Sequence, residues 1–129
     1  MEHAMKEVGR IGGMPPFLWW LPFGPVPSIE PGELKAWLDE GRALQLVDAR
    51  SGAEFRGGSI GSAAHAPVTE MPASMIRQNL DRKLPVVVLC LSGHRSPPGT
   101  RCLRARGFEA YSLRGGFIAW RKAGYGVGK

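Results

Sequence analysis

Cysteine is scarce in this chain: Cys90 and Cys102 are the only two among 129 residues. Two cysteines are too few for a disulfide framework, and they lack the paired spacing of a zinc site. The count therefore argues against a small disulfide-stapled secreted fold. It predicts a reducing compartment, for which the cytoplasm is the expected choice.

Long uninterrupted hydrophobic runs are also lacking. The apolar stretch near the N-terminus is broken by Pro15, Pro16, Pro22, Pro25 and Pro27. A membrane-spanning helix needs roughly 20 consecutive apolar residues, so we expect no transmembrane segment. The first ten residues carry Glu2 and Glu7, unlike the basic start of a signal peptide.

Acidic residues are rare in the last third of the chain. From Gly93 to Lys129 there are eight Lys or Arg residues and one acid, Glu109, and the whole chain has a net charge of +6. This imbalance favours a small anionic substrate. A solvated basic face, or loose affinity for nucleic acid, remains open. No aromatic-basic recognition motif accompanies the charge, so we expect no specific nucleic-acid partner.

The length suits one domain with a core of its own. Residues 1–27 form a separate block, which we interpret as a Pro-rich and aromatic-rich arm before a domain at 28–129. Its apolar residues are Phe17, Leu18, Trp19, Trp20, Leu21 and Phe23. The arm is expected to pack over a groove of the domain, to bind a protein partner or a second copy, or to touch a membrane surface.

Strand and helix patterns alternate from Ser28 onward. Helices are predicted at 31–40, 51–56, 71–80, 97–106 and 116–123, and strands at 44–47, 63–66, 85–89 and 110–113. The run at 85–89 is β-branched and shows no alternation, as is typical of a central strand buried on both faces. This order predicts an α/β fold with a mostly parallel sheet and helices on both faces.

A cysteine ends the central strand pattern and opens a short polar loop, Cys90-Leu91-Ser92-Gly93-His94-Arg95-Ser96. Such a loop turns backbone N–H groups inward to form an anion-binding hollow, and the following helix adds partial positive charge. A thiol there is expected to ionise readily and act as a nucleophile. The stretch is interpreted as an active site.

Three segments, in order, resemble the rhodanese (sulfurtransferase) family: VDARSGAEFRGGSIGSAAHAP at 47–67, CLSGHRS at 90–96 with Arg-Gly-Phe at 106–108, and LRGGFIAWRKAG at 113–124. The resemblance covers roughly residues 28–127. It implies a three-layer rhodanese-like fold with about five strands. It also implies transfer of sulfane sulfur through a Cys90 persulfide, from thiosulfate or a persulfide to a thiol or cyanide. No cofactor or metal is expected.

The resemblance also assigns roles. Cys90 is catalytic, and Leu91, Ser92, Gly93, His94, Arg95 and Ser96 bind the substrate. Asp48, Arg50 and Glu54 are expected to support the loop, with Arg50 paired to Glu54 four residues on. Rhodanese-like phosphatases and arsenate reductases use a loop one residue longer, so they are the less favoured alternatives. A non-catalytic binding or sulfur-relay module is the main alternative.

This chain departs from the family pattern at a few positions. Ser59 stands where His is usual, which predicts a weakened structural contact. Pro97 and Pro98 follow the loop and remove two backbone donors, so if Ser96 is the N-cap, its hydroxyl must bind the amide of Gly99. His65 is expected to be a satisfied structural histidine, and Cys102 a half-buried packing residue. Phe117 and Trp120 are expected in the core.

Overall fold

The computed structural model describes residues 26–71, 73–92 and 96–126. The predictions for residues 1–25 of the arm and for Gly93, His94 and Arg95 concern residues outside these ranges. The elements in chain order are β1 (Ser28–Ile29), α2 (Pro31–Asp39), β2 (Gln45–Asp48), α3 (Gly52–Arg56), β3 (Ala64–His65), the 3₁₀ turn η2 (Val68–Glu70), α4 (Ala73–Ile76), β4 (Val86–Leu89), α5 (Ser96–Ala105), β5 (Ala110–Leu113) and α6 (Gly116–Lys122).

The five strands form one sheet in the order β1-β5-β4-β2-β3, and every pairing is parallel. β4 lies in the centre, with Val88 opposite Val47 of β2 and opposite Ser112 of β5. All four residues of β4 are buried, as the sequence predicted for the run at 85–89. The expected α/β fold of about five strands is therefore confirmed.

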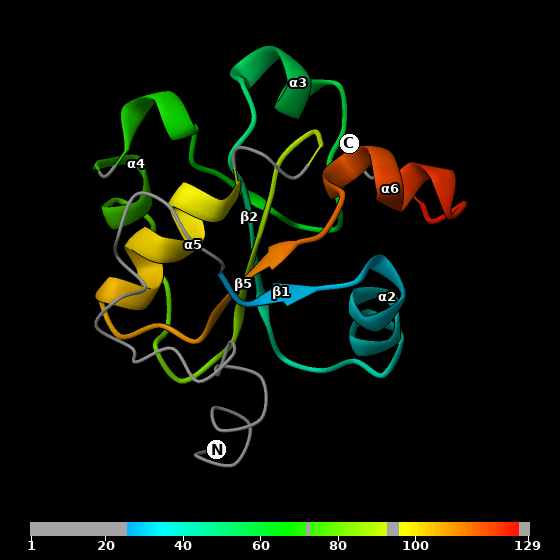
Figure 1. The fold of residues 1–129 in the computed structure, drawn as a ribbon, viewed down its shortest axis with the longest axis horizontal. Coiled ribbons are helices and arrows are strands. Elements are labelled where there is room, and N and C mark those ends of the chain that lie inside the picture. The colour runs from blue at the N-terminus through cyan, green and yellow to red at the C-terminus, as the bar shows by residue number, and fades with distance from the viewer. Residues whose placement is uncertain (1–25, 72, 93–95, 127–129) are drawn as a thin grey trace.

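Helices cover both faces of the sheet (Figure 1). One apolar cluster joins Val87 and Leu89 of β4 to Leu34 of α2 and to Phe117 and Trp120 of α6. The predicted core positions of Phe117 and Trp120 are thus confirmed.

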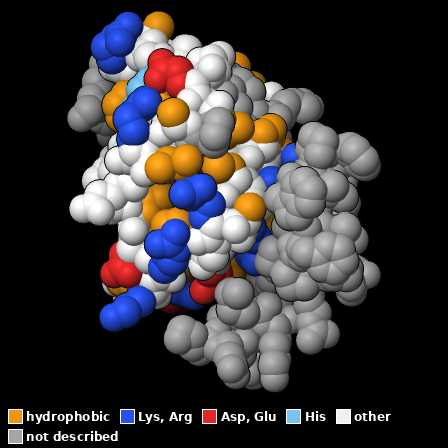
Figure 2. All heavy atoms as spheres, turned by 90° about the vertical axis from the view of Figure 1, so that its left-hand side faces the viewer, with side chains coloured by type: hydrophobic (Ala, Val, Ile, Leu, Met, Phe, Trp, Pro, Cys, Tyr) orange, Lys and Arg blue, Asp and Glu red, His pale blue; other side chains and the backbone are white. Residues whose placement is uncertain are grey.

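A second apolar cluster fills the opposite face, where Val86 and Val88 meet Met75 of α4 and Leu103 of α5. Because successive residues of a strand point to opposite faces, one β-branched strand supplies both clusters. On the side of the molecule that carries α4 and α5, hydrophobic side chains reach the surface among Lys and Arg side chains (Figure 2).

The predicted helix at 71–80 is largely wrong. α4 has only four residues, Ala73–Ile76, and the side chain of Ile76 is 47% exposed. Pro72 disfavours helical geometry for the residue before it, which explains the late start. After α4, the side-chain amide of Gln78 donates to the carbonyl oxygens of Ser74 at 2.9 Å and His65 at 3.1 Å.

Two smaller differences concern element ends. The sequence did not predict β1, because two residues are too few to show a period. α5 begins at Ser96, so Pro97 and Pro98 are its second and third residues and Ser96 lies inside the helix. The predicted end of this helix is confirmed: Gly107 has φ +92°, and the Phe108 amide donates to the carbonyl of Leu103 at 3.1 Å.

Candidate active site at the carboxyl end of β4

The candidate site lies where two neighbouring strands end. β2 ends at Asp48 and is followed by Arg50, while β4 ends at Leu89 and is followed by Cys90. The amide of Ala49 donates to the carbonyl of Leu89 at 2.8 Å, which ties the two strand ends together. Carboxyl ends of adjacent parallel strands are the usual place for a functional site in open α/β sheets.

Cys90 is fully buried, with 0% of its surface exposed. Within the described part of the chain it belongs to neither apolar cluster. Its carbonyl oxygen accepts a hydrogen bond from the amide of Phe117 at 2.7 Å, and the carbonyl of Leu91 accepts one from Ile118 at 2.9 Å. The first turn of α6 therefore holds the start of the cysteine loop from the backbone.

Two glycines allow α6 to begin at this place. Gly115 and Gly116 have φ +75° and +62°, a left-handed conformation that other residues rarely adopt. A Cβ atom at Gly115 would lie only 2.6 Å from the Cβ of Ala119. The Gly-Gly pair thus turns the chain so that the amides of Phe117 and Ile118 can donate to the carbonyls of the cysteine loop.

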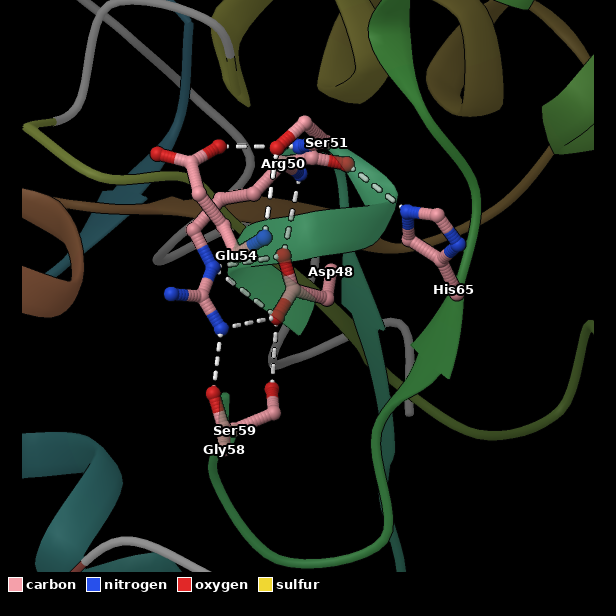
Figure 3. Close-up of polar contacts among 7 residues, drawn as sticks. All are labelled: Asp48, Arg50, Ser51, Glu54, Gly58, Ser59 and His65. Carbon is pink, nitrogen blue, oxygen red and sulfur yellow. Dashed lines mark hydrogen bonds and ion pairs between the residues drawn. The ribbon is translucent and has the colours of Figure 1, made fainter. Parts of the chain in front are cut away.

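Asp48, which lies opposite Leu89 in the sheet, forms a buried ion pair with Arg50. Figure 3 shows this pair and its hydrogen-bond partners. The guanidinium of Arg50 binds the carboxylate of Asp48 through Nη2 at 2.7 Å and Nε at 2.9 and 3.1 Å. The Arg50 amide also donates to Asp48 Oδ1, at 2.9 Å. The side chains are 3% and 0% exposed, so both charges are satisfied by each other away from water.

The pair is extended by the segment that follows α3. Arg50 Nη2 donates to the carbonyl of Gly58 at 2.6 Å, and the hydroxyl of Ser59 donates to Asp48 Oδ2 at 2.6 Å. The expectation that Ser59 weakens a structural contact stays a prediction, but the residue does keep a contact. The short side chain is buried and makes a direct hydrogen bond to the carboxylate.

The expected pairing of Arg50 with Glu54 is wrong, because the carboxylate that binds Arg50 in the described structure is that of Asp48. Glu54 instead closes the start of α3: its carboxylate accepts from the Ser51 amide at 2.9 Å, and its own amide donates to the Ser51 hydroxyl at 3.2 Å. This is a capping box, in which each residue satisfies the other's backbone. Glu54 therefore shapes the turn that follows Arg50.

Arg50 also reaches the element that holds Cys90. Its guanidinium carbon lies 4.0 Å from the centre of the Phe117 ring, within the range of a cation–π contact. Because the Phe117 amide binds the Cys90 carbonyl, the ion pair and the cysteine loop are joined through one residue. The sequence identified Phe117 only as a core residue and missed its contacts with Arg50 and the Cys90 carbonyl. The glycine pair before it, which turns the chain toward the cysteine loop, is the sequence feature that could have indicated them.

His65 and Cys102 both make contacts within the fold. His65 Nε2 lies 2.8 Å from the carbonyl oxygen of Arg50, and its ring stacks on Phe55 with centroids 4.7 Å apart. The interpretation of His65 as a satisfied histidine is confirmed. Cys102 is half-buried against the second apolar cluster, and burial raises the pKa of its thiol. Neither cysteine forms a disulfide.

The structure describes only part of the predicted substrate loop. Cys90, Leu91 and Ser92 are described, Gly93 to Arg95 are not, and of Ser96 only the backbone is. The anion-binding hollow therefore stays a prediction. Because Pro97 and Pro98 have no N–H, they remove two of the four free amides that begin an α-helix.

Comparisons with known proteins show the family of this chain. The rhodanese-like domain family matches residues 30–123, and this chain belongs to that family. The thiosulfate sulfurtransferase GlpE of Shewanella oneidensis is 34% identical over 87 residues, which are 67% of this chain and 84% of that protein. A rhodanese-related protein from Thermoplasma volcanium has a similar crystal structure, with a TM-score of 0.66, 26% identity and coverage of 78% of this chain and 95% of that one.

A longer relative is the probable adenylyltransferase/sulfurtransferase MoeZ of Mycobacterium tuberculosis. It is 33% identical over 96 residues, which are 74% of this chain and 24% of MoeZ. The chain therefore spans about a quarter of that relative.

None of the helices that the structure describes has the length and apolar character of a membrane-spanning helix.

Proposed function

We propose that this chain is a sulfurtransferase in which Cys90 carries a sulfane sulfur as a persulfide. The observation that carries the proposal is the position of Cys90, at the carboxyl end of the central strand with its carbonyl bound by α6, in a chain of the rhodanese-like family. The thiosulfate sulfurtransferase named among the relatives supports the reaction class.

The proposed reaction has two half-reactions. In the first, the Cys90 thiolate attacks the outer sulfur of thiosulfate, the S–S bond breaks, and sulfite leaves with the electron pair. In the second, cyanide or a thiolate attacks the outer sulfur of the Cys90 persulfide, and the Cys90 thiolate is the leaving group. The enzyme is modified and restored in turn, so ping-pong kinetics are expected.

The charge of the chain supports an anionic donor. Eight basic residues and one acid lie between Gly93 and Lys129. We propose that the amides of Leu91 to Ser96, together with the Arg95 guanidinium, hold the donor and the persulfide. Asp48, Arg50 and Glu54 are proposed as support for this loop. Backbone amides aimed at an anion stabilise it best where water is excluded, and Cys90 is fully buried.

Mass spectrometry of the intact protein tests this proposal. After incubation with thiosulfate, we expect a mass gain of about 32 Da, one sulfur atom, which cyanide then removes. The gain should disappear in Cys90→Ser and remain in Cys102→Ser, the matched control for the second thiol. Absence of an adduct with thiosulfate and with organic persulfides, or an adduct that persists in Cys90→Ser, would contradict the proposal.

A sulfur-relay module is the second candidate. It is favoured by the match to about a quarter of MoeZ, a longer protein named as an adenylyltransferase and sulfurtransferase. In this case the Cys90 persulfide would form, but turnover of thiosulfate and cyanide would be negligible without a partner protein. Steady-state thiocyanate production therefore separates the two candidates once the persulfide has been detected.

The remaining assignments are also proposals. We place the boundary between arm and domain at residues 27 and 28, supported by a family match that begins at residue 30 and by β1 at Ser28. We propose that the aromatic residues at 17–23 contact a protein partner. The low cysteine count supports a reducing compartment, for which we propose the cytoplasm.

A further inference from the structure

We propose that Leu91 and Ile118 form an acceptor-docking surface, which binds a polypeptide whose cysteine takes the sulfur and is flanked by apolar and acidic side chains. The inference rests on the proposed sulfurtransferase function and names the class of acceptor. It is carried by the exposure of two apolar side chains beside Cys90, by the backbone contacts that join them, and by the charge next to them.

The two side chains are unusual among the described residues because they are large, apolar and exposed. Leu91 is 37% exposed and Ile118 is 47% exposed. Ile76, also 47% exposed, is the third such side chain in the described part, and it lies on α4. Two of the three thus belong to the cysteine loop and to the helix that holds it.

Backbone hydrogen bonds place this surface at the candidate site. The Ile118 amide donates to the Leu91 carbonyl at 2.9 Å, one residue along from the bond between Phe117 and Cys90. Cys90 itself is fully buried, so only the end of an acceptor comes close to its sulfur. The body of the acceptor must then contact the residues around it, and in the described part of the chain Leu91 and Ile118 are the large apolar ones exposed there.

The charge next to the surface is positive. Arg121 and Lys122 follow Ile118 by three and four residues on α6, so they lie on the same side of the helix, and both are exposed. The guanidinium of Arg121 lies 6.0 Å from the Phe117 ring. No Asp or Glu occurs from 110 to 126. An acidic side chain on the acceptor complements this charge.

A polypeptide acceptor fits these features better than the other candidates. Cyanide and thiosulfate have no apolar surface to place against Leu91 and Ile118. The phosphates of nucleic acid would bind Arg121 and Lys122, but they would make no apolar contact with Leu91 and Ile118. Apolar contact inside a charged rim is the usual arrangement of a protein interface.

The docked reaction is the second half-reaction with a cysteine as acceptor. The acceptor thiolate attacks the outer sulfur of the Cys90 persulfide, and a new S–S bond forms on the acceptor. The bond between the two sulfur atoms on Cys90 breaks, and its electron pair stays on the Cys90 sulfur. One sulfane sulfur moves, no external oxidant or reductant is used, and the total charge is unchanged.

Two synthetic acceptor peptides test the proposal. One has the sequence Glu-Leu-Cys-Leu-Glu and the other Lys-Ser-Cys-Ser-Lys, each acetylated and amidated. With thiosulfate as donor, we expect the acidic apolar peptide to have the lower KM. Ile118→Ser should raise that KM by about fivefold to tenfold, because roughly half of an isoleucine side chain loses its apolar contact. Arg121→Gln should raise it by a smaller factor.

The controls separate this inference from the proposed function. Ile76→Ser removes an equally exposed isoleucine on α4 and should leave the KM for the acidic peptide unchanged. The reaction of thiosulfate with cyanide should be unchanged in Ile76→Ser. In Ile118→Ser the KM for cyanide should change less than the KM for the acidic peptide, because cyanide makes no apolar contact. Binding of the acidic peptide, with its cysteine replaced by serine and a fluorescent label attached, gives a second measurement by anisotropy that needs no sulfur transfer.

Three results would overturn the inference. They are a KM and an anisotropy Kd that Ile118→Ser does not change, an equal effect of Ile76→Ser, and a preference for the basic peptide. Displacement of the labelled peptide by an RNA oligonucleotide, with no effect of Ile118→Ser, would assign the surface to nucleic acid instead. Failure of the Cys90 persulfide to form would contradict the proposed function, while the anisotropy would still decide the docking surface.

Discussion

Replacing Ser59 by alanine tests whether the hydrogen bond to Asp48 stabilises the fold. The hydroxyl lies 2.6 Å from Asp48 Oδ2, and both side chains are buried. A hydrogen bond to a charged group contributes about 1.5–3 kcal/mol to stability. Arg50 keeps its bonds to the carboxylate in the variant, so we expect a loss in this range and no unfolding. The magnitude corresponds to the loss of one charge-assisted bond.

Urea unfolding followed by circular dichroism measures this loss. With an m-value of about 1–3 kcal/mol per molar urea, the midpoint should fall by on the order of 1 M. Ser62→Ala removes an exposed hydroxyl three residues later and should leave the midpoint unchanged within error. If Ser59→Ala costs less than about 0.5 kcal/mol, the buried bond does not carry the stability that its geometry suggests.

Two further predictions concern α6 and the core. Gly115→Ala should destabilise the protein more than Gly124→Ala in thermal unfolding: both glycines have positive φ, but only at Gly115 would the new methyl meet another at 2.6 Å. Equal losses of stability in the two variants would show that the contact between the methyl groups at 115 and 119 does not destabilise the fold. Burial and the Glu109 carboxylate raise the pKa of Tyr111, so the unfolded chain loses this proton first, and stability should decline above about pH 10. In Tyr111→Phe, urea midpoints measured from pH 8 to 11 should decline less steeply with pH. An unchanged slope of midpoint against pH would show that Tyr111 does not cause the decline.

The arrangement of the sheet could be predicted because its signals are local and strong. The β-branched run at 86–89 has no polar position, so it is buried on both faces, and the structure places it in the centre. Asp48 ends one strand and Cys90 follows the next strand of the sheet, and parallel strands bring their carboxyl ends together. The sequence therefore placed Asp48 and Cys90 at the same edge of the sheet, where the structure also has them.

The contacts within the site were harder to predict, because they depend on the path of the chain between strands. A spacing of four residues suggested that Arg50 pairs with Glu54, as it would inside a helix. The chain instead turns directly after β2, and the Arg50 amide and guanidinium both bind Asp48. Ser59 reaches Asp48 across eleven positions of sequence, a contact that no local pattern reveals.

Short elements were the other source of error. β1 has two residues and α4 has four, so neither gives a readable period. Met71, Met75 and Leu80 do pack against the second apolar cluster, as their spacing suggested, but only Met75 does so from a helix. Ile76 belonged to the same predicted apolar set but is 47% exposed, so the spacing was right for three of the four residues and did not predict the backbone that carries them.

The pairing of β1 with β5 has a consequence for how the protein is made. Ser28 lies opposite Ser112, and the amide that binds the Cys90 carbonyl belongs to Phe117. During synthesis, the ribosome must release almost the whole domain before β1 can pair with β5 or the cysteine loop can bind α6. Such distant pairings slow folding, because a large loop must close before any contact rewards it. A nascent chain that stalls before α6 would therefore lack the two backbone hydrogen bonds that hold the start of the cysteine loop.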